Sequence, residues 1–177
     1  MVYVIENVTI DATNSPTGSG IFIENSMVSF IIRNCSVYNA NNSAAGYAGI
    51  RLRSTYNGIL INNNCSDNGM NGIILGNDCR NNIVSGNIAN KNAQYGIYLS
   101  SSSFNTISGN NENENTQSGI YIRNSENNYI LQKMVARNPN GISLIDDSKF
   151  NSVSENTVAN NQMGCIFMLN IGVGFSV

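Results

Sequence analysis

The chain has 177 residues, of which 11% are charged, a net charge of −2 and no histidine. It therefore has no cationic face for nucleic acid or anionic lipid, and it lacks the commonest general base and transition-metal ligand. No apolar run reaches the length of about 18 residues that a membrane-spanning helix needs. We expect no nucleic-acid partner, no membrane span, no metal site and no cofactor.

The first part of the chain, residues 1–48, contains short apolar stretches in an irregular repeat. Val4-Ile5-Glu6-Asn7 aligns on Ile31-Ile32-Arg33-Asn34, so residues 1–10 match the later part of a coil. We therefore expect a strand at the first residues of this sequence and no signal peptide within it. A long turn is expected from Tyr38 to Ala48, where Asn, Ser and Gly accumulate.

From residue 49 onward, a glycine recurs every 22 to 24 residues and opens a short apolar strand. These glycines are Gly49, Gly72, Gly96, Gly119, Gly141 and Gly164. Each repeat holds three apolar patches with period-two alternation and no helical stripe. A fixed period of this size is typical of a solenoid. We predict an all-β fold, a right-handed single-stranded parallel β-helix of about seven coils of 22–24 residues, which forms one domain over residues 1–177.

The alternation assigns two columns of side chains to the interior of the coils. They are Ile21, Ile50, Ile73, Ile97, Ile120, Ile142 and Cys165, and then Ile23, Leu52, Leu75, Leu99, Ile122, Leu144 and Phe167. Cys165 stands in an isoleucine column, and we predict that it is a buried apolar filler. Cys35 and Cys65 fall in inward columns of successive coils but are offset by two positions, so we expect no disulfide between them.

Asparagine is the outlier of the composition, with 34 residues of 177. Two asparagine columns are predicted at the corners of the coils, because Asn tolerates a left-handed backbone and stacked amides can hydrogen-bond from coil to coil. One column reads Asn7, Asn34, Asn62, Asn87, Asn110, Lys133 and Asn156, and the other Asn57, Asn82, Asn105, Asn128 and Asn151. Lys133 is the exception, and we expect Lys133→Asn to be neutral or stabilising.

The repeat resembles that of a known family. The phrase Gly-Ile-Tyr-Leu-Ser-Ser-Ser-Ser-Phe-Asn-Thr-Ile-Ser-Gly-Asn, residues 96–110, is similar to the β-helix repeats of NosD-like proteins. These belong to the carbohydrate-binding proteins and sugar hydrolases of the pectin-lyase-like fold. The resemblance covers residues 49–163. It implies a location outside the cytoplasm, at the cell surface, secreted or periplasmic, and it implies the fold more specifically than an activity.

The resemblance also places a working surface on the outward positions of the strand that follows each repeat glycine. Tyr98 and Tyr121 fall on successive coils of one outward column, where they could stack on sugar rings or on each other. Arg123, Asp146 and Asp147 lie near the same face. Hydrolysis needs two carboxylates about 5–10 Å apart, whereas adjacent aspartates in a turn are expected to point apart. We take these five residues as candidate substrate-binding residues and assign no catalytic residue.

These patterns favour a non-catalytic structural or binding module of a surface or secreted protein, with a polysaccharide or glycan as partner. The first alternative is a carbohydrate-active hydrolase or lyase. The second is a periplasmic metal-handling accessory protein, in which Cys and Met could bind only Cu(I). Arg51 and Arg53 are interpreted as ordinary surface charges. The apolar ends predict contacts with further coils of a longer parent chain, or self-association.

Overall fold

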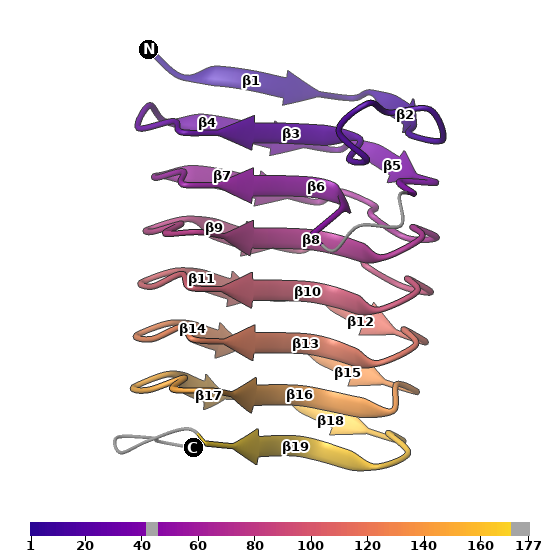
Figure 1. Cartoon of the computed structure of the whole chain (residues 1–177), viewed down its shortest axis with the longest axis vertical. Helices are drawn as coiled ribbons and strands as arrows, with labels where there is room; N and C mark the ends of the chain where they lie inside the picture. Colours follow the sequence, from indigo (N-terminus) through magenta and orange to yellow (C-terminus); the bar gives the residue numbers. More distant parts are fainter. Residues whose placement is uncertain (42–45, 171–177) are drawn as a thin grey trace.

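The computed structural model describes residues 1–41 and 46–170, and there the chain winds into a stack of coils built from short strands (Figure 1). One wall of the stack, here called the glycine sheet, has 7 parallel strands in the order β19-β16-β13-β10-β8-β6-β3. Its strands are β3 (Ile21–Glu24), β6 (Ala48–Arg53), β8 (Asn71–Gly76), β10 (Tyr95–Ser100), β13 (Ser118–Arg123), β16 (Asn140–Ile145) and β19 (Gly164–Leu169).

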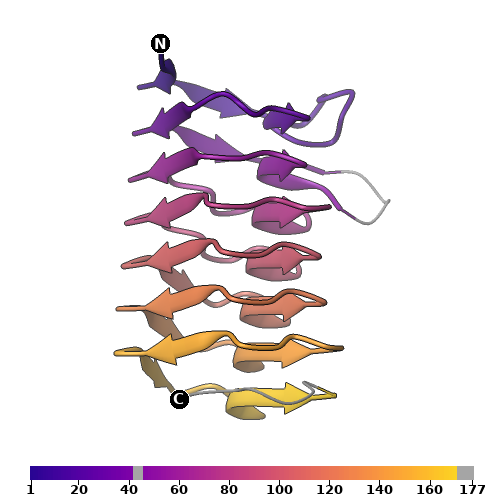
Figure 2. The same cartoon turned by 90° about the vertical axis from the view of Figure 1, so that its left-hand side faces the viewer.

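Two further walls close each coil, so that strands one coil apart lie side by side (Figure 2). The second sheet consists of β1 (Tyr3–Glu6), β4 (Phe30–Arg33), β7 (Gly58–Ile61), β9 (Ile83–Ser85), β11 (Thr106–Ser108), β14 (Tyr129–Leu131) and β17 (Ser152–Ser154). The third wall consists of β2 (Thr9–Asp11), β5 (Ser36–Tyr38), β12 (Asn111–Asn113), β15 (Met134–Ala136) and β18 (Thr157–Ala159). The predicted all-β parallel solenoid is confirmed. In the two described ranges, no helix could cross a membrane.

Stacked isoleucine and leucine side chains fill the interior. Ile97 lies opposite Ile73 on one side and Ile120 on the other, and all three are fully buried. Burying such a side chain contributes about 1.5–3 kcal/mol. The repeat glycine is needed because the backbone of the neighbouring strand approaches closely: a Cβ on Gly96 in β10 would lie 2.6 Å from the carbonyl oxygen of Gly119 in β13. The period of the sequence is therefore a packing constraint repeated in each coil.

The last coil departs from the predicted register. β19 pairs with β16 so that Ile166, and not Cys165, lies opposite Ile142, and Met168, and not Phe167, lies opposite Leu144. Cys165 is exposed, which contradicts its prediction as a buried filler. The shift arises between β18 and β19, because β18 still pairs in the regular register, with Thr157 opposite Met134. Two residues then separate Asn161 from Gly164, where one separates Asn138 from Asn140 in the preceding coil.

The cysteines of the described residues are all free. Cys35, Cys65 and Cys79 are buried, and Cys165 is exposed. Cys35 lies one residue before Ser36, which pairs with Asn64, so Cys65 is offset along the strand from Cys35 as expected. The absence of a disulfide between these two residues agrees with the prediction.

Asparagine side chains stack inside three corners of the coils. The sets are Asn63, Asn87 and Asn110; Asn82, Asn105, Asn128 and Asn151; and Asn68, Asn92, Asn115, Asn138 and Asn161. Asn105 is typical, because its Nδ2 donates to Asn128 Oδ1 at 3.1 Å and to the carbonyl of Cys79 at 2.9 Å. Each amide thus satisfies backbone groups that would otherwise be buried without partners.

The membership of these columns differs from the prediction at the N-terminal end. Asn7, Asn34, Asn62 and Asn57 have φ between 54° and 57° and occupy the corner position one residue before the stacked side chain. In those coils the next residue occupies the interior position. Asn63 follows Asn62 in this way, and its N–H donates to Asn87 Oδ1. Gly58 follows Asn57, and its N–H donates to Asn82 Oδ1 at 2.8 Å. The third column was not predicted. A coil corner needs both a left-handed residue and an inward amide, and asparagine suits both positions, which makes a one-residue shift invisible in the sequence.

Lys133, which stands in an asparagine column, has an ion-pair partner in the interior of the coils. Its ammonium lies 3.3 Å from Glu112 Oε1, and both side chains have 0% exposure. Glu112 stands at the inward position of β12, where Val135 stands one coil later, and its Oε2 has no hydrogen-bond partner. Burial lowers the pKa of Lys133 to about 8 and raises the pKa of Glu112. This geometry argues against the prediction that Lys133→Asn is neutral or stabilising, because the substitution would leave a buried carboxyl group unpaired.

Candidate functional site

The outer face of the glycine sheet carries a different side chain at almost every coil. One outward column reads Phe22, Arg51, Ile74, Tyr98, Tyr121, Ser143 and Phe167, and the next reads Glu24, Arg53, Gly76, Ser100, Arg123, Ile145 and Leu169. The last members are Phe167 and Leu169, so Phe167, which was predicted to face inward, lies on the outer face because of the shifted register of β19. Structural demands are repetitive along a solenoid, so variation on one face marks where function can be placed.

Three tyrosines form a cluster at the middle of this face. Tyr98 and Tyr121 lie on neighbouring strands, as predicted, with ring centroids 5.4 Å apart at an angle of 60°. Tyr95 stacks on Tyr121, with centroids 4.2 Å apart and planes within 4°. Sequence reasoning missed Tyr95, whose only signal was an aromatic residue directly before a repeat glycine. Burial raises the pKa of the Tyr95 and Tyr121 phenols, which keeps both protonated at neutral pH.

An arginine–aspartate pair borders the tyrosine cluster. Arg123 Nε lies 3.0 Å from Asp146 Oδ2 across one coil spacing. This ion pair raises the pKa of Arg123, and the neighbouring Tyr98 and Tyr121 contribute to the same rise. Asp147 points elsewhere and pairs with Lys149 at 3.1 Å. Of the five predicted binding residues, the structure thus brings together Tyr98, Tyr121, Arg123 and Asp146, while Asp147 lies apart.

A groove of about 610 Å³ runs beside this cluster toward the C-terminal coil. Tyr95 and Tyr121 form one side, and Gln117, Asn140, Phe167 and Leu169 contribute to the rest of the lining. The lining thus combines aromatic faces with amide groups, the combination that suits a sugar, whose faces are apolar and whose hydroxyls need hydrogen-bond partners.

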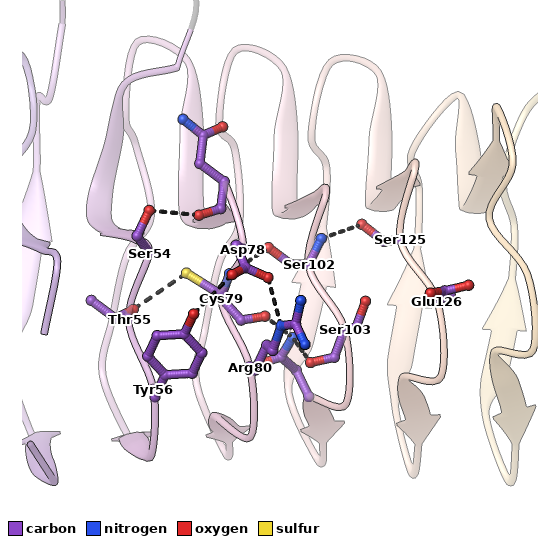
Figure 3. Close-up of polar contacts among 12 residues, drawn as sticks. Ser54, Thr55, Tyr56, Asp78, Cys79, Arg80, Ser102, Ser103, Ser125 and Glu126 are labelled. Atoms are coloured by element: carbon purple, nitrogen blue, oxygen red, sulfur yellow. Dashed lines mark hydrogen bonds and ion pairs between the residues drawn. The ribbon is translucent and has the colours of Figure 1, made fainter. Parts of the chain in front are cut away.

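A second polar cluster lies at the turns that follow the glycine sheet (Figure 3). Tyr56 Oη donates to Asp78 Oδ2 at 2.8 Å, and Arg80 pairs with the other oxygen. These hydrogen bonds, from Tyr56 first, lower the pKa of Asp78. Beneath them, the Cys79 N–H donates to Ser102 Oγ at 3.2 Å, in an interior column of small hydroxyl and thiol residues. Each carboxylate oxygen of Asp78 thus has a partner within the cluster, so we interpret the cluster as a stabilised corner.

Metal-ligand residues do not converge in the described ranges. Residues 1–41 and 46–170 contain no group of three or more His, Cys, Asp or Glu side chains that could hold a metal ion.

The sequence belongs to a recognised family. Residues 2–163 match the family described as the right handed beta helix region, so the chain is a member of that family. This membership agrees with the predicted fold class. No curated protein matches the sequence.

Solved structures that match the fold include two epimerases and a phage tailspike domain. The periplasmic alginate epimerase AlgG is 20% identical with a TM-score of 0.60, over 95% of this chain and 42% of that one. The A-module of the mannuronan C-5 epimerase AlgE6 from Azotobacter vinelandii is 13% identical with a TM-score of 0.66, over 99% of this chain and 59% of that one. The enzymatically active domain of tailspike protein 2 from bacteriophage CBA120 is 14% identical with a TM-score of 0.57, over 86% of this chain and 31% of that one.

These similarities show the fold, and this chain spans only about four to six tenths of the length of the two epimerase structures. They also correct the prediction of a non-catalytic module. The structures that match are two epimerases and an enzymatically active tailspike domain, and this finding contradicts the prediction that the protein is not an enzyme. At 13–20% identity these structures show the fold and no activity of this chain.

Proposed function

We propose that the protein is a carbohydrate-active enzyme that binds a polysaccharide on the outer face of the glycine sheet and cleaves it by elimination, as a lyase. The observation that carries this proposal is the cluster of Tyr95, Tyr98 and Tyr121 around the Arg123–Asp146 pair, beside a groove of about 610 Å³. Enzymes of the same fold that act on alginate and mannuronan support the substrate class.

The distribution of carboxylates favours elimination over hydrolysis. Glycoside hydrolysis uses two carboxyl groups that flank the scissile bond. Asp146 is directed at Arg123 beside the tyrosines, whereas Asp147 is directed at Lys149. The cluster thus offers one carboxylate, one guanidinium and protonated phenols, which are the groups that elimination from a uronic acid requires.

The steps follow from these groups. Arg123 binds the carboxylate of a uronic acid residue, which makes the neighbouring C–H bond more acidic. Asp146, released from Arg123 by the substrate, accepts that proton. The electron pair of the C–H bond forms a carbon–carbon double bond, and the bond from the sugar to the leaving glycosidic oxygen breaks. The phenol of Tyr121, kept protonated by its raised pKa, donates a proton to that oxygen.

A panel of acidic and neutral polysaccharides tests the proposal. A lyase generates both new reducing ends and ultraviolet-absorbing unsaturated ends, whereas a hydrolase generates only reducing ends. We expect Asp146→Asn to lower kcat by about 100-fold or more, the usual contribution of a general base. Asp147→Asn is the matched control, because it removes an adjacent carboxylate that is paired outside the cluster. No turnover on any acidic polysaccharide, or equal loss in both variants, would contradict the proposal.

We propose an extracytoplasmic location for this activity. The periplasmic location stated for AlgG and the phage tailspike with the same fold support it, together with the resemblance to NosD-like repeats. Cell fractionation followed by immunodetection would test it, and recovery with a cytoplasmic marker would refute it.

We also propose that the single β-helix domain over residues 1–177 contacts further coils of a longer solenoid, or copies of itself, at its ends. Exposed apolar side chains at both ends support this: Val4 is 47% exposed at one end, and Phe167 is 43% exposed at the other. Light scattering is expected to detect oligomers at high micromolar concentration. A stable monomer there would overturn this proposal.

A further inference from the structure

Arg51 is held in an unusual setting at the N-terminal part of the outer face of the glycine sheet. Its guanidinium carbon lies 5.0 Å from the ring centroid of Phe22 and 5.9 Å from that of Tyr47. Both contacts are within the range of cation–π attraction, and they fix the position of a half-buried charge. Burial, and then the neighbouring Arg53, lower the pKa of Arg51, and the charge of Glu24, which pairs directly with Arg53, offsets this only in part.

Arg51 has no carboxylate partner among the described residues, unlike almost every other cation there. Seven ion pairs involve seven of the nine lysines and arginines, and Arg51 and Lys91 are the two that remain. Arg53, two residues further along β6, pairs with Glu24 at 2.8 Å. The sequence of residues 42–45 contains no acidic side chain either. A fixed, partly desolvated and unpaired guanidinium is suited to an anionic ligand.

The setting of Arg51 is continuous with the tyrosine cluster. A hollow of about 220 Å³ is lined by Arg51, Arg53 and Ile74 and by Tyr98 and Ser100. Arg51 pairs in register with Ile74, and Ile74 with Tyr98, so Arg51 and Tyr98 are two strands apart. At the usual strand spacing this separates their backbones by about 10 Å. A polysaccharide chain that lies along the axis of the coils over Tyr98 therefore reaches Arg51.

We propose that Arg51 forms a second carboxylate-binding subsite, which engages a uronic acid residue of an acidic polysaccharide at a distance from Arg123. This inference rests on the proposed function, because it takes the tyrosine cluster as the main binding site. The rings of Phe22 and Tyr47 position the guanidinium, and the substrate carboxylate supplies the direct ion-pair partner that Arg51 lacks among the described residues. The subsite selects for chain length, because only a chain long enough to span both arginines uses it.

The test is calorimetric binding of uronic acid trisaccharides and octasaccharides, with neutral octasaccharides for comparison. Arg51→Met removes the charge and retains an aliphatic chain over the rings. We expect it to weaken octauronide binding by about tenfold or more, as expected for one charge-assisted hydrogen-bonded contact. Binding of the trisaccharide and of neutral octasaccharides should change less than twofold. Lys91→Met is the matched control, since Lys91 is also unpaired but lines a separate pocket with Asp67.

The outcomes separate this inference from the proposed function. If the unaltered protein binds no acidic oligosaccharide, the proposed function fails. If it binds octauronide and Arg51→Met behaves like Lys91→Met, the second subsite is refuted while the main site stands. If Arg51→Met does not fold, Arg51→Lys tests the same point. Lysine keeps the positive charge but lacks the planar guanidinium, so this variant should weaken octauronide binding and leave trisaccharide binding unchanged. Equal loss for both chain lengths would refute the subsite.

Discussion

The corners inside the coils and the outer face of the glycine sheet obey opposite rules. Inside, the same side chain recurs from coil to coil, as in Asn82, Asn105 and Asn128, and each amide bonds to the next. Outside, the column through Arg51, Ile74 and Tyr98 changes chemistry at each step. The interior repeats because every coil must satisfy the same buried backbone groups. The outer face has no such requirement, so its residues are free to form a site.

The buried pair of Lys133 and Glu112 is the exception to the repeated interior side chains. Substitution within this pair is expected to have the largest effect on the free energy of unfolding. Lys133→Asn restores the asparagine column but leaves Glu112 unpaired among apolar side chains. We expect a loss of about 3–5 kcal/mol in the free energy of unfolding. Chemical denaturation measures it.

The double variant Lys133→Asn with Glu112→Val is the control for that experiment. It makes both columns regular, since Val135 occupies the next position after Glu112. Replacing a buried ion pair by well-packed groups is often neutral or stabilising. Stability of the double variant should therefore equal or exceed that of the unaltered protein. If the single variant were also neutral, the ion pair would have no structural role.

The next largest effect is expected inside a regular corner. Asn110 Oδ1 accepts hydrogen bonds from the backbone N–H of Asn87 at 2.8 Å and from its Nδ2 at 2.9 Å. Asn110→Ala leaves these buried donors unpaired, and we expect a cost of about 1–3 kcal/mol. A denaturant midpoint that does not move would show that water or rearrangement satisfies them. The exposed Asn14 provides a control, because Asn14→Ala should change stability by less than about 0.5 kcal/mol.

The pH dependence of stability is a further test of the buried pair of Lys133 and Glu112. The pKa of Lys133 is lowered to about 8 by burial, and lysine in the unfolded chain has a pKa of about 10.4. Between these values the unfolded state binds more protons, so stability rises with pH, by at most about 1.4 kcal/mol per pH unit for one group. Denaturant midpoints measured across this window should show the rise, and the double variant should lack this part of it. The same rise in the double variant would assign it to other groups.

The smallest stability effect is predicted on the outer face. Tyr121→Ala removes the stacking with Tyr95 and the edge contact with Tyr98, which are worth about 0.5–1.5 kcal/mol. Tyr121→Phe keeps the ring and should be nearly neutral for stability, yet it should lower turnover because the phenol is lost. A loss for Tyr121→Ala as large as that for Lys133→Asn would mean that the tyrosine cluster is structural.

Much of the candidate site could be placed from the sequence because its residues follow the repeat. Tyr98 and Tyr121 occupy the same position relative to Gly96 and Gly119, and parallel strands in register bring them together. Tyr95 could not be found this way, since its stacking on Tyr121 depends on the direction of its side chain. The separation of Asp147 from Asp146 was expected, but their different partners, Lys149 and Arg123, required the geometry of the turn.

The sequence by itself determined the solenoid, its period and its apolar interior, because each coil repeats one local solution to the same packing problem. Only the tertiary structure decided the register of the last coil, the membership of the asparagine columns and the pairing of Lys133 with Glu112. These depend on single-residue insertions at corners and on contacts between side chains of different coils. A period constrains the average coil, whereas a shift of one residue reverses which side chains face inward, so the exceptions to the repeat are set by three-dimensional packing.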